Sequence, residues 1–480
     1  MRPQIYLISL AASPLILSLN ALYVEKIITR EAIATETVAQ ISESSASLRQ
    51  TGLQLVYTGQ LFAALEKLEA ALTVARDSGD RTEEADTLVA IAEIQNMLGD
   101  KTAGTETVQQ ALTIYRDEGQ KTGEAAALRI LSALQNEVEP NETVDETAAQ
   151  ALAVAKESGS ALQHGFTLLF MGTRRITQQN HEQGLAYFKE AQPLLASEPS
   201  SVDEALWKKY YQPWMLVSTA LAQFEQAPDQ VMGTLEEAIA HSQSTGNLSA
   251  EGVALFVKGL WQAKQKETAN ALASYQQAVE ILTPTDQRQV LISTLLAKSR
   301  GHRVQASEQD QSEQQGEVKA AYQRAIESAQ SALEVAQNLG EPVRISNAFS
   351  HTVWAYIENA HFHSNRAVTL REAGNNSLAD DQFALTETLS QTSIEKALEA
   401  LEQVPQMQND AAVSTIHDTV IAAYDQAGQR YGQQVLAHRI AGDFEASVMA
   451  NRNVCDRAVG NSARTVNRIW KNAAAGFSKD

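Results

Sequence analysis

The sequence predicts an all-α protein, a solenoid of antiparallel helix pairs, and three observations carry this prediction. A phrase recurs every forty residues, as ALTVARDSG at 71–79, ALTIYRDEG at 111–119 and ALAVAKESG at 151–159. Aromatic residues make up 6% of the 480-residue chain and proline only 10 positions, which is typical of helical rather than β-rich proteins. Each copy of the phrase ends in glycine, which most readily takes the left-handed conformation with which helices end.

Composition and charge exclude several classes of function. With 38 Lys and Arg against 58 Asp and Glu, the net charge is −20, and most of the surface would repel a phosphate backbone, so we expect no nucleic-acid partner. Cys455 is the single cysteine, so no intrachain disulfide and no cysteine-based metal site can form.

The first element is an apolar segment over residues 1–34. One basic residue precedes an apolar run from Ile5 to about Val24, after which charged residues begin, and this order is typical of a secretory signal. Cleavage would follow Ala21 or Ala34. An uncleaved membrane anchor and a cytosolic capping helix are the alternatives. We therefore expect a periplasmic, luminal or extracellular protein, or a membrane-anchored one, ahead of a cytoplasmic one.

Residues 35–285 form the regular part of the predicted solenoid. Helix-breaking turns, TGQ at 58–60 and LGD at 98–100, stand about twenty residues before the ends of the first two copies of the phrase. Apolar residues recur at helical spacing on both sides of the second turn. Each forty-residue period therefore predicts a helix, a turn and an antiparallel helix.

Four periods place small residues at three matching positions and a bulky residue at a fourth. They are Gly52, Ala64, Leu68 and Ala71; Ala92, Gly104, Val108 and Ala111; Gly172, Gly184, Phe188 and Ala191; and Gly259, Ala271, Tyr275 and Ala278. This pattern resembles the tetratricopeptide-repeat family, in a long-repeat variant similar to kinesin light chains. The resemblance implies a right-handed superhelix whose first helices line a concave groove that holds a protein or peptide ligand.

The pattern degenerates in the C-terminal half. Residues 286–318 predict a helix and a polar low-complexity insertion, ASEQDQSEQQGE at 306–317, which is either a loop or a solvated helix extension. Residues 319–443 keep only the general pattern of helical hairpins, because the spacing between equivalent alanines stretches to 54 and 65 residues.

Seven residues are candidates for contacting a partner, because the resemblance places them on the groove side of first helices. They are Glu93, Asn96, Arg129, Asn136, Leu169, Thr173 and Phe256. We do not expect the clamp for a C-terminal carboxylate that some family members have, since Ala133 stands where the asparagine partner of Arg129 is needed. Packing between repeats is the alternative role of the apolar members, Leu169 and Phe256.

Two stretches resemble motifs for catalysis or cofactor binding, but each lacks a residue that its motif requires. GDKTAGTE at 99–106 has threonine in place of the phosphate-loop lysine, and HEQGL at 181–185 has leucine in place of the second zinc-binding histidine. His351, Glu358 and His361 share one helix face, but the two histidines would lie about 15 Å apart along the axis, too far for one metal ion. We therefore predict no catalytic residue, no metal and no cofactor.

Residues 444–480 predict a basic amphipathic helix. The basic side chains that would share one face are Arg457, Arg464, Arg468 and Lys471. Three roles stay open for this segment. It is a cap that closes the solenoid, a docking face for the acidic repeats of the same or a second copy, or a contact with an anionic membrane.

Taken together, these features predict a non-enzymatic protein–protein interaction scaffold. The first alternative is a regulatory or ligand-sensing module, anchored to a membrane. The second is an enzyme built on the solenoid, which would need a polar cluster that the sequence does not reveal. Self-association into a homo-oligomer stays open.

Overall fold

The computed structural model describes residues 44–135, 142–199, 201–310, 315–407 and 409–440. Apart from Ser44, these residues belong to one compact unit, Ser45–Asp480. The predicted N-terminal segment and the predicted basic tail lie outside the described residues.

Regular structure in this part of the chain is helical, with seventeen α-helices that alternate as first and second members of pairs. The first helices are α2 (Ser45–Tyr57), α4 (Arg81–Leu98), α6 (Lys121–Leu134), α8 (Ala161–Thr177), α10 (Val202–Gln226), α12 (Leu248–Lys264), α14 (Arg288–Asp310), α16 (Pro342–Glu372) and α18 (Asp410–Ile440). The second helices are α3 (Leu61–Ser78), α5 (Lys101–Asp117), α7 (Glu142–Ser158), α9 (His181–Leu195), α11 (Val231–Thr245), α13 (Thr268–Leu282), α15 (Gln315–Leu339) and α17 (Asn376–Gln403). Two 3-10 helices, η1 (Pro228–Gln230) and η2 (Val404–Gln406), complete the order.

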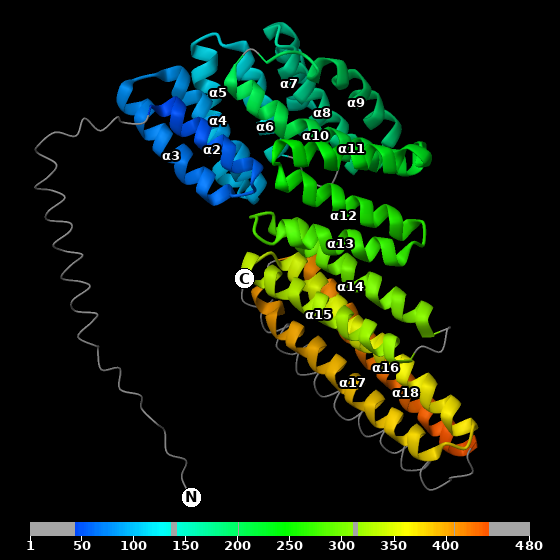
Figure 1. Cartoon of the computed structure of the whole chain (residues 1–480). Coiled ribbons are helices and arrows are strands. Elements are labelled where there is room, and N and C mark those ends of the chain that lie inside the picture. The colour runs from blue at the N-terminus through cyan, green and yellow to red at the C-terminus, as the bar shows by residue number, and fades with distance from the viewer. Residues whose placement is uncertain (1–43, 136–141, 200, 311–314, 408, 441–480) are drawn as a thin grey trace, which may run out of the picture. The chain divides into compact units, whose positions relative to one another are not determined.

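Each first helix up to α16 packs against the second helix of its own pair, and consecutive pairs stack in chain order (Figure 1). A lone helical pair cannot bury its apolar face, so the stack creates the core. The predicted all-α solenoid of antiparallel helix pairs is confirmed.

The helices of a pair approach most closely at the small residues that the sequence singled out. A Cβ added to Gly52 of α2 would lie 2.9 Å from Leu68 Cγ of α3, and one added to Gly172 of α8 would lie 2.4 Å from the Phe188 ring of α9. The bulky residue of the second helix therefore occupies the space that the small residue leaves. This is the packing of tetratricopeptide-like pairs, and the resemblance is confirmed at this level.

The glycine that closes the recurring phrase ends a helix in the predicted way. Gly79 has a φ of 68°, and nothing lies within 4 Å of the position of an added Cβ, so its role is conformational. Its N–H donates to the Arg76 carbonyl, and the N–H of Asp80 donates to the Ala75 carbonyl. These two bonds satisfy carbonyls that the end of α3 leaves open.

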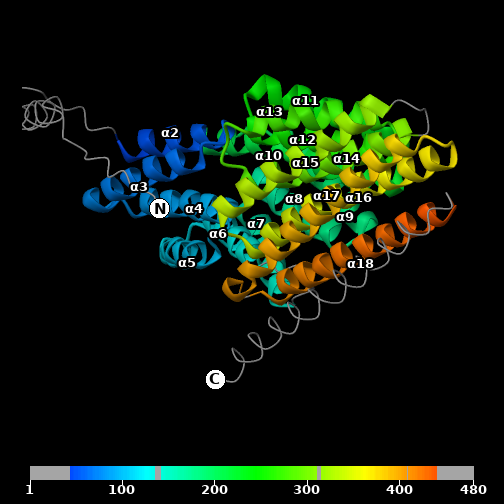
Figure 2. The same cartoon turned by 90° about the horizontal axis from the view of Figure 1, so that it is seen from below.

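The C-terminal helices are longer than those of the first pairs. Helix α16 has 31 residues against 13 in α2. Helices α14 and α15 enter the polar stretch 306–317 from its two ends, α14 as far as Asp310 and α15 from Gln315, so helix extends into this stretch. Helices α16, α17 and α18 pack against one another (Figure 2).

A contact between distant parts of the sequence joins the first pair to the middle of the solenoid. The N–H of Asp286, between α13 and α14, donates to the carbonyl of Gly59 in the α2–α3 turn, over 2.7 Å. The Asp286 carboxylate accepts from the Phe62 N–H at 3.3 Å. The turn and the loop meet closely, since a Cβ on Gly59 would lie 2.6 Å from that of Thr285.

Among the described helices, none has both the length and the apolar character needed to cross a membrane.

Candidate partner-binding site

The side chains predicted to bind a partner in the first pairs are buried under the chain's own helix α10. Glu93 and Arg129 are each 6% exposed, and Arg129 Nη1 lies 3.3 Å from Glu93 Oε2. The Arg129 guanidinium stands 5.0 Å from the centroid of the Tyr211 ring of α10. Leu169 is 5% exposed. A ligand would have to displace α10 to reach these three residues.

Helix α10 covers this face with the aromatic residues of its N-terminal half. Trp207 stacks on Tyr211 with ring centroids 5.5 Å apart, and Tyr211 lies 4.9 Å from Phe166 of α8. The Tyr210 hydroxyl reaches the sulfur of Met97 in α4, at 3.6 Å. These rings form one core cluster with α2, α3 and α4 and another with α8 and α9. The first four first helices therefore turn their groove side toward an internal helix.

Charge inside this region is balanced locally. Burial by itself would lower the pKa of Arg129, but Tyr211 and Glu93 outweigh it and raise that pKa. Burial raises the pKa of the Tyr211 hydroxyl well above its ordinary value, Arg129 opposes the rise and Glu93 adds to it. Arg129 therefore stays charged and pairs with Glu93. It cannot take a proton from a substrate, because it already carries one.

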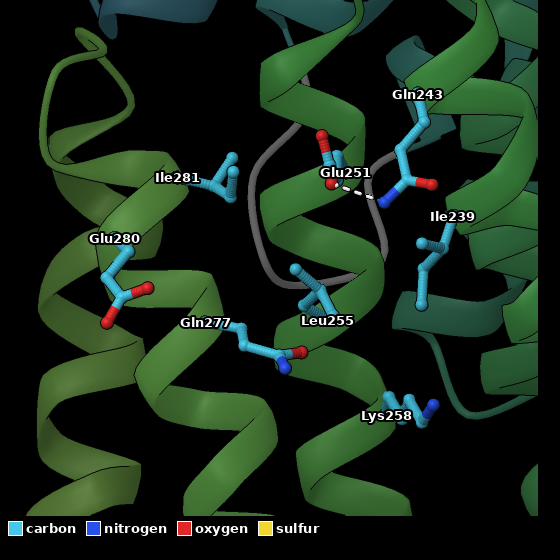
Figure 3. A pocket seen from close by; sticks show the side chains of 8 residues that line it. All are labelled: Ile239, Gln243, Glu251, Leu255, Lys258, Gln277, Glu280 and Ile281. Carbon is cyan, nitrogen blue, oxygen red and sulfur yellow. Dashed lines mark hydrogen bonds between the residues drawn. The ribbon is translucent and has the colours of Figure 1, made fainter.

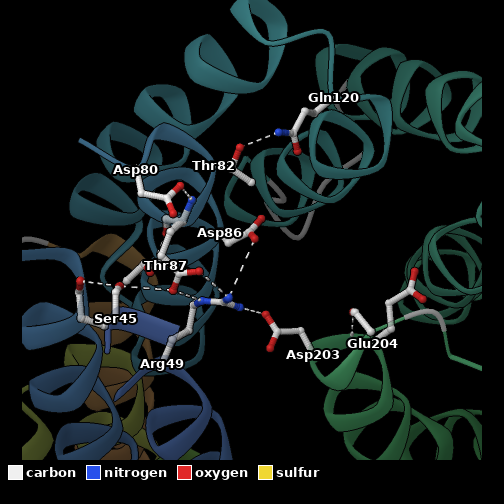
Figure 4. Close-up of polar contacts among 12 residues, drawn as sticks. Ser45, Arg49, Asp80, Thr82, Asp86, Thr87, Gln120, Asp203 and Glu204 are labelled. Atoms are coloured by element: carbon white, nitrogen blue, oxygen red, sulfur yellow. Dashed lines mark hydrogen bonds and ion pairs between the residues drawn. The ribbon is translucent and has the colours of Figure 1, made fainter. Parts of the chain in front are cut away.

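A second buried arginine ties α10 to α2 and α4 (Figure 4). Arg49, 6% exposed, donates from Nε and Nη2 to the two carboxylate oxygens of Glu83, both at 2.9 Å. Its other terminal nitrogen, Nη1, contacts Asp203 at the start of α10, and Nη2 lies 3.9 Å from Asp86. Burial would lower the pKa of Arg49, but the hydrogen bond to Glu83 and the neighbouring carboxylates raise it. One guanidinium thus joins three helices.

The carboxylates around Arg49 have partners of their own. The Tyr115 hydroxyl of α5 donates to Asp86 at 2.6 Å, and the Ser45 hydroxyl donates to Glu83 at 3.2 Å. Burial raises the pKa of Asp86, while Tyr115 and Arg49 oppose the rise. Figure 4 shows Arg49 between Asp86 and Asp203, and such pairing of a buried cation with carboxylates is the arrangement of a structural ion cluster rather than of a catalytic site.

The other predicted groove residues are half-buried or lie outside the described residues. Asn96, Thr173 and Phe256 are partly exposed, and the Thr173 hydroxyl donates to Ser218 of α10 at 3.3 Å. Asn136 lies outside the described residues, as do all four residues of the predicted basic face, Arg457, Arg464, Arg468 and Lys471. Contact of any of these residues with a partner stays a prediction.

The histidine-rich stretch of α16 contributes no metal site that the structure shows. Glu358 pairs with Arg303 of α14 at 3.0 Å, and His363 hydrogen bonds to Gln382 of α17 at 2.6 Å. Across the described ranges, no three histidine, cysteine or carboxylate side chains converge as metal ligands would.

A half-open pocket of about 310 Å³ lies over α12 between α11 and α13 (Figure 3). Ile239, Leu255 and Ile281 give it apolar walls. Glu251, only 8% exposed, accepts from Gln243 at 2.9 Å at one end, and Lys258 stands toward the other. Its volume is at the lower limit of small-molecule sites.

The fold and these contacts define the class of the protein as a tetratricopeptide-like α-solenoid whose N-terminal groove face is internally occupied. No family model matches the chain, and no curated protein matches it.

Several solved structures of helical-repeat proteins are similar to it. One is a signal transduction ATPase with numerous domains that carries a tetratricopeptide repeat sensor, from Pyrococcus horikoshii, with a TM-score of 0.43, 10% identity, and coverage of 78% of this chain and 53% of that one. This chain therefore spans about half the length of that protein. A second is a Rap protein complexed with competence and sporulation factor, with a TM-score of 0.40, 10% identity, and coverage of 79% and 99%.

A third is the human IFIT1 dimer with m7Gppp-AAAA, with a TM-score of 0.34, 13% identity, and coverage of 88% of this chain and 91% of that chain. The exclusion of nucleic acid stays a prediction for this chain. None of the three is a kinesin light chain, so that finer likeness also stays a prediction.

Sequence reasoning missed the role of α10. Four aromatic residues stand within the eight residues of WKKYYQPW at 207–214, although only 6% of the chain is aromatic. That local density, at the point where the repeat spacing slips, was the available signal.

Proposed function

We propose that this protein is a non-enzymatic protein–protein interaction scaffold that binds its partner on the first helices α12, α14 and α16. The observation that carries this proposal is a difference in exposure. Glu93, Arg129 and Leu169 are buried beneath α10, whereas Val304 of α14 is 43% exposed and Trp354 of α16 is 36% exposed. Large apolar side chains left in water on such a face are typical of interaction sites.

Crosslinked affinity purification of the full chain from its native source tests the scaffold. We expect a stoichiometric partner whose crosslinks fall on α12, α14 or α16, and whose recovery falls when Trp354→Ala replaces the wild type. Phe62→Ala is the matched control, since Phe62 is 63% exposed on α3, which is not one of the three proposed helices. Crosslinks confined to α4 and α6 would instead favour a groove that opens by releasing α10. Recovery of the protein alone would refute the scaffold.

A ligand-sensing module is the second candidate, and the pocket over α12 favours it. Ile239, Leu255 and Ile281 offer an apolar floor, while Glu251 and Lys258 offer one charge of each sign. This combination suits a small zwitterion with an aliphatic side chain. Leucine raising the melting temperature of the wild type but not of Leu255→Trp would support this function.

The compartment and the tail belong to the same proposal. Export of the protein is supported by the apolar run from Ile5 to about Val24, and the intact mass of native protein tests it. Loss of the first 21 or 34 residues is the expected result, and retention of Met1 would refute it.

For the basic tail we favour a cap on the solenoid, so deleting residues 444–480 should lower the melting temperature, and unchanged melting would point to docking elsewhere.

A further inference from the structure

Helices α14 and α16 present a face that combines exposed apolar side chains with arginines. We name it the α14–α16 face and define it by Arg300, Arg303, Val304, His351, Trp354 and Glu358. Val304 and Trp354 are two of the seven large hydrophobic side chains that are exposed in the described part of the chain. Arg300 is exposed as well.

The members of this face adjoin one another across the two helices. Arg303 Nη1 lies 3.0 Å from Glu358 Oε1, which ties α14 to α16 at this level. Trp354 lies between His351 and Glu358 on α16, because positions i, i+3 and i+7 share one side of a helix. Arg300 and Val304 are likewise one turn apart on α14. The Arg303–Glu358 pair thus brings the Trp354 side of α16 next to the side of α14 that carries Arg300 and Val304.

The charge of the face is positive in an acidic chain. Burial, with Arg303 and Arg300 adding to it, lowers the pKa of His351 to about 4, so this histidine is neutral at pH 7. Glu358 neutralises the charge of Arg303. The charge of Arg300 stays unpaired, since no carboxylate in the described residues is within ion-pair distance of it. Arg303 also keeps a buried Nε–H that finds no acceptor within the described ranges. A carboxylate from outside would pair with the exposed Arg300.

We propose that the α14–α16 face binds an extended acidic segment of a partner protein, with an apolar side chain of the segment on Trp354 and Val304 and a neighbouring carboxylate on Arg300. This inference rests on the proposed scaffold function and names the chemistry of its partner. Guanidinium groups recognise carboxylates through parallel hydrogen bonds, and an aromatic anchor beside them supplies the apolar contact. Only two arginines and one indole lie here, which suits a short carboxylate-bearing segment better than a polyphosphate backbone along an acidic protein.

The test uses the full chain and a fluorescent synthetic peptide of alternating Glu and Leu, read by polarisation. A Lys–Leu peptide of the same length and a single-stranded RNA oligonucleotide are the comparison probes. We expect the Glu–Leu peptide to bind, and Trp354→Ala or Arg300→Glu to weaken it by about thirtyfold or more. Lys67→Glu and Phe62→Ala, which change exposed side chains of α3, should leave its affinity unchanged.

Each other outcome overturns the inference. Equal binding of the Lys–Leu peptide would mean that the arginines do not select charge, and insensitivity to Arg300→Glu would mean that they do not contact the segment. No binding of the Glu–Leu peptide would remove the acidic class, and RNA binding that Arg300→Glu abolishes would replace it with nucleic acid. The binding result for Trp354→Ala counts only if the variant has the same melting temperature as the wild type, measured by circular dichroism. A native partner that crosslinks to α16 yet withstands Arg300→Glu would leave the scaffold standing and overturn this chemistry alone.

Discussion

Buried arginines of the N-terminal pairs, and Arg371 of α16 beside Asp380, are held by carboxylates, whereas Arg430 of α18 is held by a backbone carbonyl among the described residues. Arg49 and Arg129 each lie against carboxylates from neighbouring helices, and so does Arg174, whose Nε is 2.9 Å from Asp145. Arg430 of α18 is 3% exposed, and among the described residues its Nη2 donates to the Ile357 carbonyl while its Nε and Nη1 find no acceptor.

The difference teaches where each region obtains its stability and where it can bind. The N-terminal pairs are joined by ion pairs across helices and closed by α10, so Arg49 and Arg129 are paired internally. The C-terminal pairs rely on long helices packed side by side and on the ion pairs Arg303–Glu358 and Arg371–Asp380, and they leave the Arg300 side chain and the Trp354 ring exposed. Interaction sites require such unused groups.

The largest expected effect is the loss of the ion cluster at Arg49. Arg49→Met leaves Glu83, Asp86 and Asp203 without their shared cation, and breaking a buried pair in this way costs about 3–5 kcal/mol. Urea unfolding of the variant and the wild type measures it. Arg76→Met is the control, since Arg76 pairs with Glu84 at 2.9 Å but its side chain is 48% exposed, so we expect a loss below about 1 kcal/mol. Similar losses at both positions would contradict the internal role of Arg49.

The next effect concerns acid and the C-terminal pairs. Burial lowers the pKa of His302 from 6.5 to about 4, with Arg324 and Lys298 adding to the shift and Gln305 and Glu327 opposing it. The unfolded chain therefore binds a proton before the folded chain does. The stability from this histidine is complete above about pH 6.5 and is lost as the pH falls toward about 4.

His302→Gln should remove that dependence. The loss of unfolding free energy over this pH window should shrink by on the order of 3 kcal/mol, from 6.5 − 4 = 2.5 units at 1.36 kcal/mol each. Urea unfolding at both ends of the window measures it, with His417→Gln as the control because His417 is exposed on α18. An unchanged acid response in His302→Gln would rule out His302 as its source.

The helix pairs could be predicted from the sequence because their contacts are local and repeated. Gly52 meets Leu68 within one period, and the same spacing recurs in Gly172 and Phe188. The position of α10 could not be predicted, because Tyr210 meets Met97 across 113 residues. Such contacts depend on how small rotations between successive pairs add up, and no local spacing encodes that sum. For the same reason the sequence pattern predicted an open groove at Arg129, where the structure has α10.

A moderate effect should follow when the contact between the first pair and the α13–α14 loop is disturbed. Gly59→Ala forces a left-handed φ of 71° on an alanine whose Cβ would lie 2.6 Å from Thr285 Cβ. Gly79→Ala has the same conformational cost, with a φ of 68°, but meets nothing within 4 Å. Thermal and urea unfolding should show that Gly59→Ala costs about 1–3 kcal/mol more than Gly79→Ala. Equal costs would mean that the loop yields and that this contact contributes no stability.

The smallest expected effect sharpens the comparison of the arginines. Burial lowers the pKa of Arg430 to about 10. A hydrogen bond to one backbone carbonyl offsets little of the free energy that desolvating its guanidinium costs. Arg430→Met keeps the apolar stem and removes the charge, so the free energy of unfolding should stay within about 1 kcal/mol of the wild type or rise. Arg129→Met is the matched substitution in the N-terminal pairs, where the stranded Glu93 should cost about 3–5 kcal/mol. Equal losses would mean that Arg430 has an anionic partner in the intact protein, and the two regions would then obey the same rule.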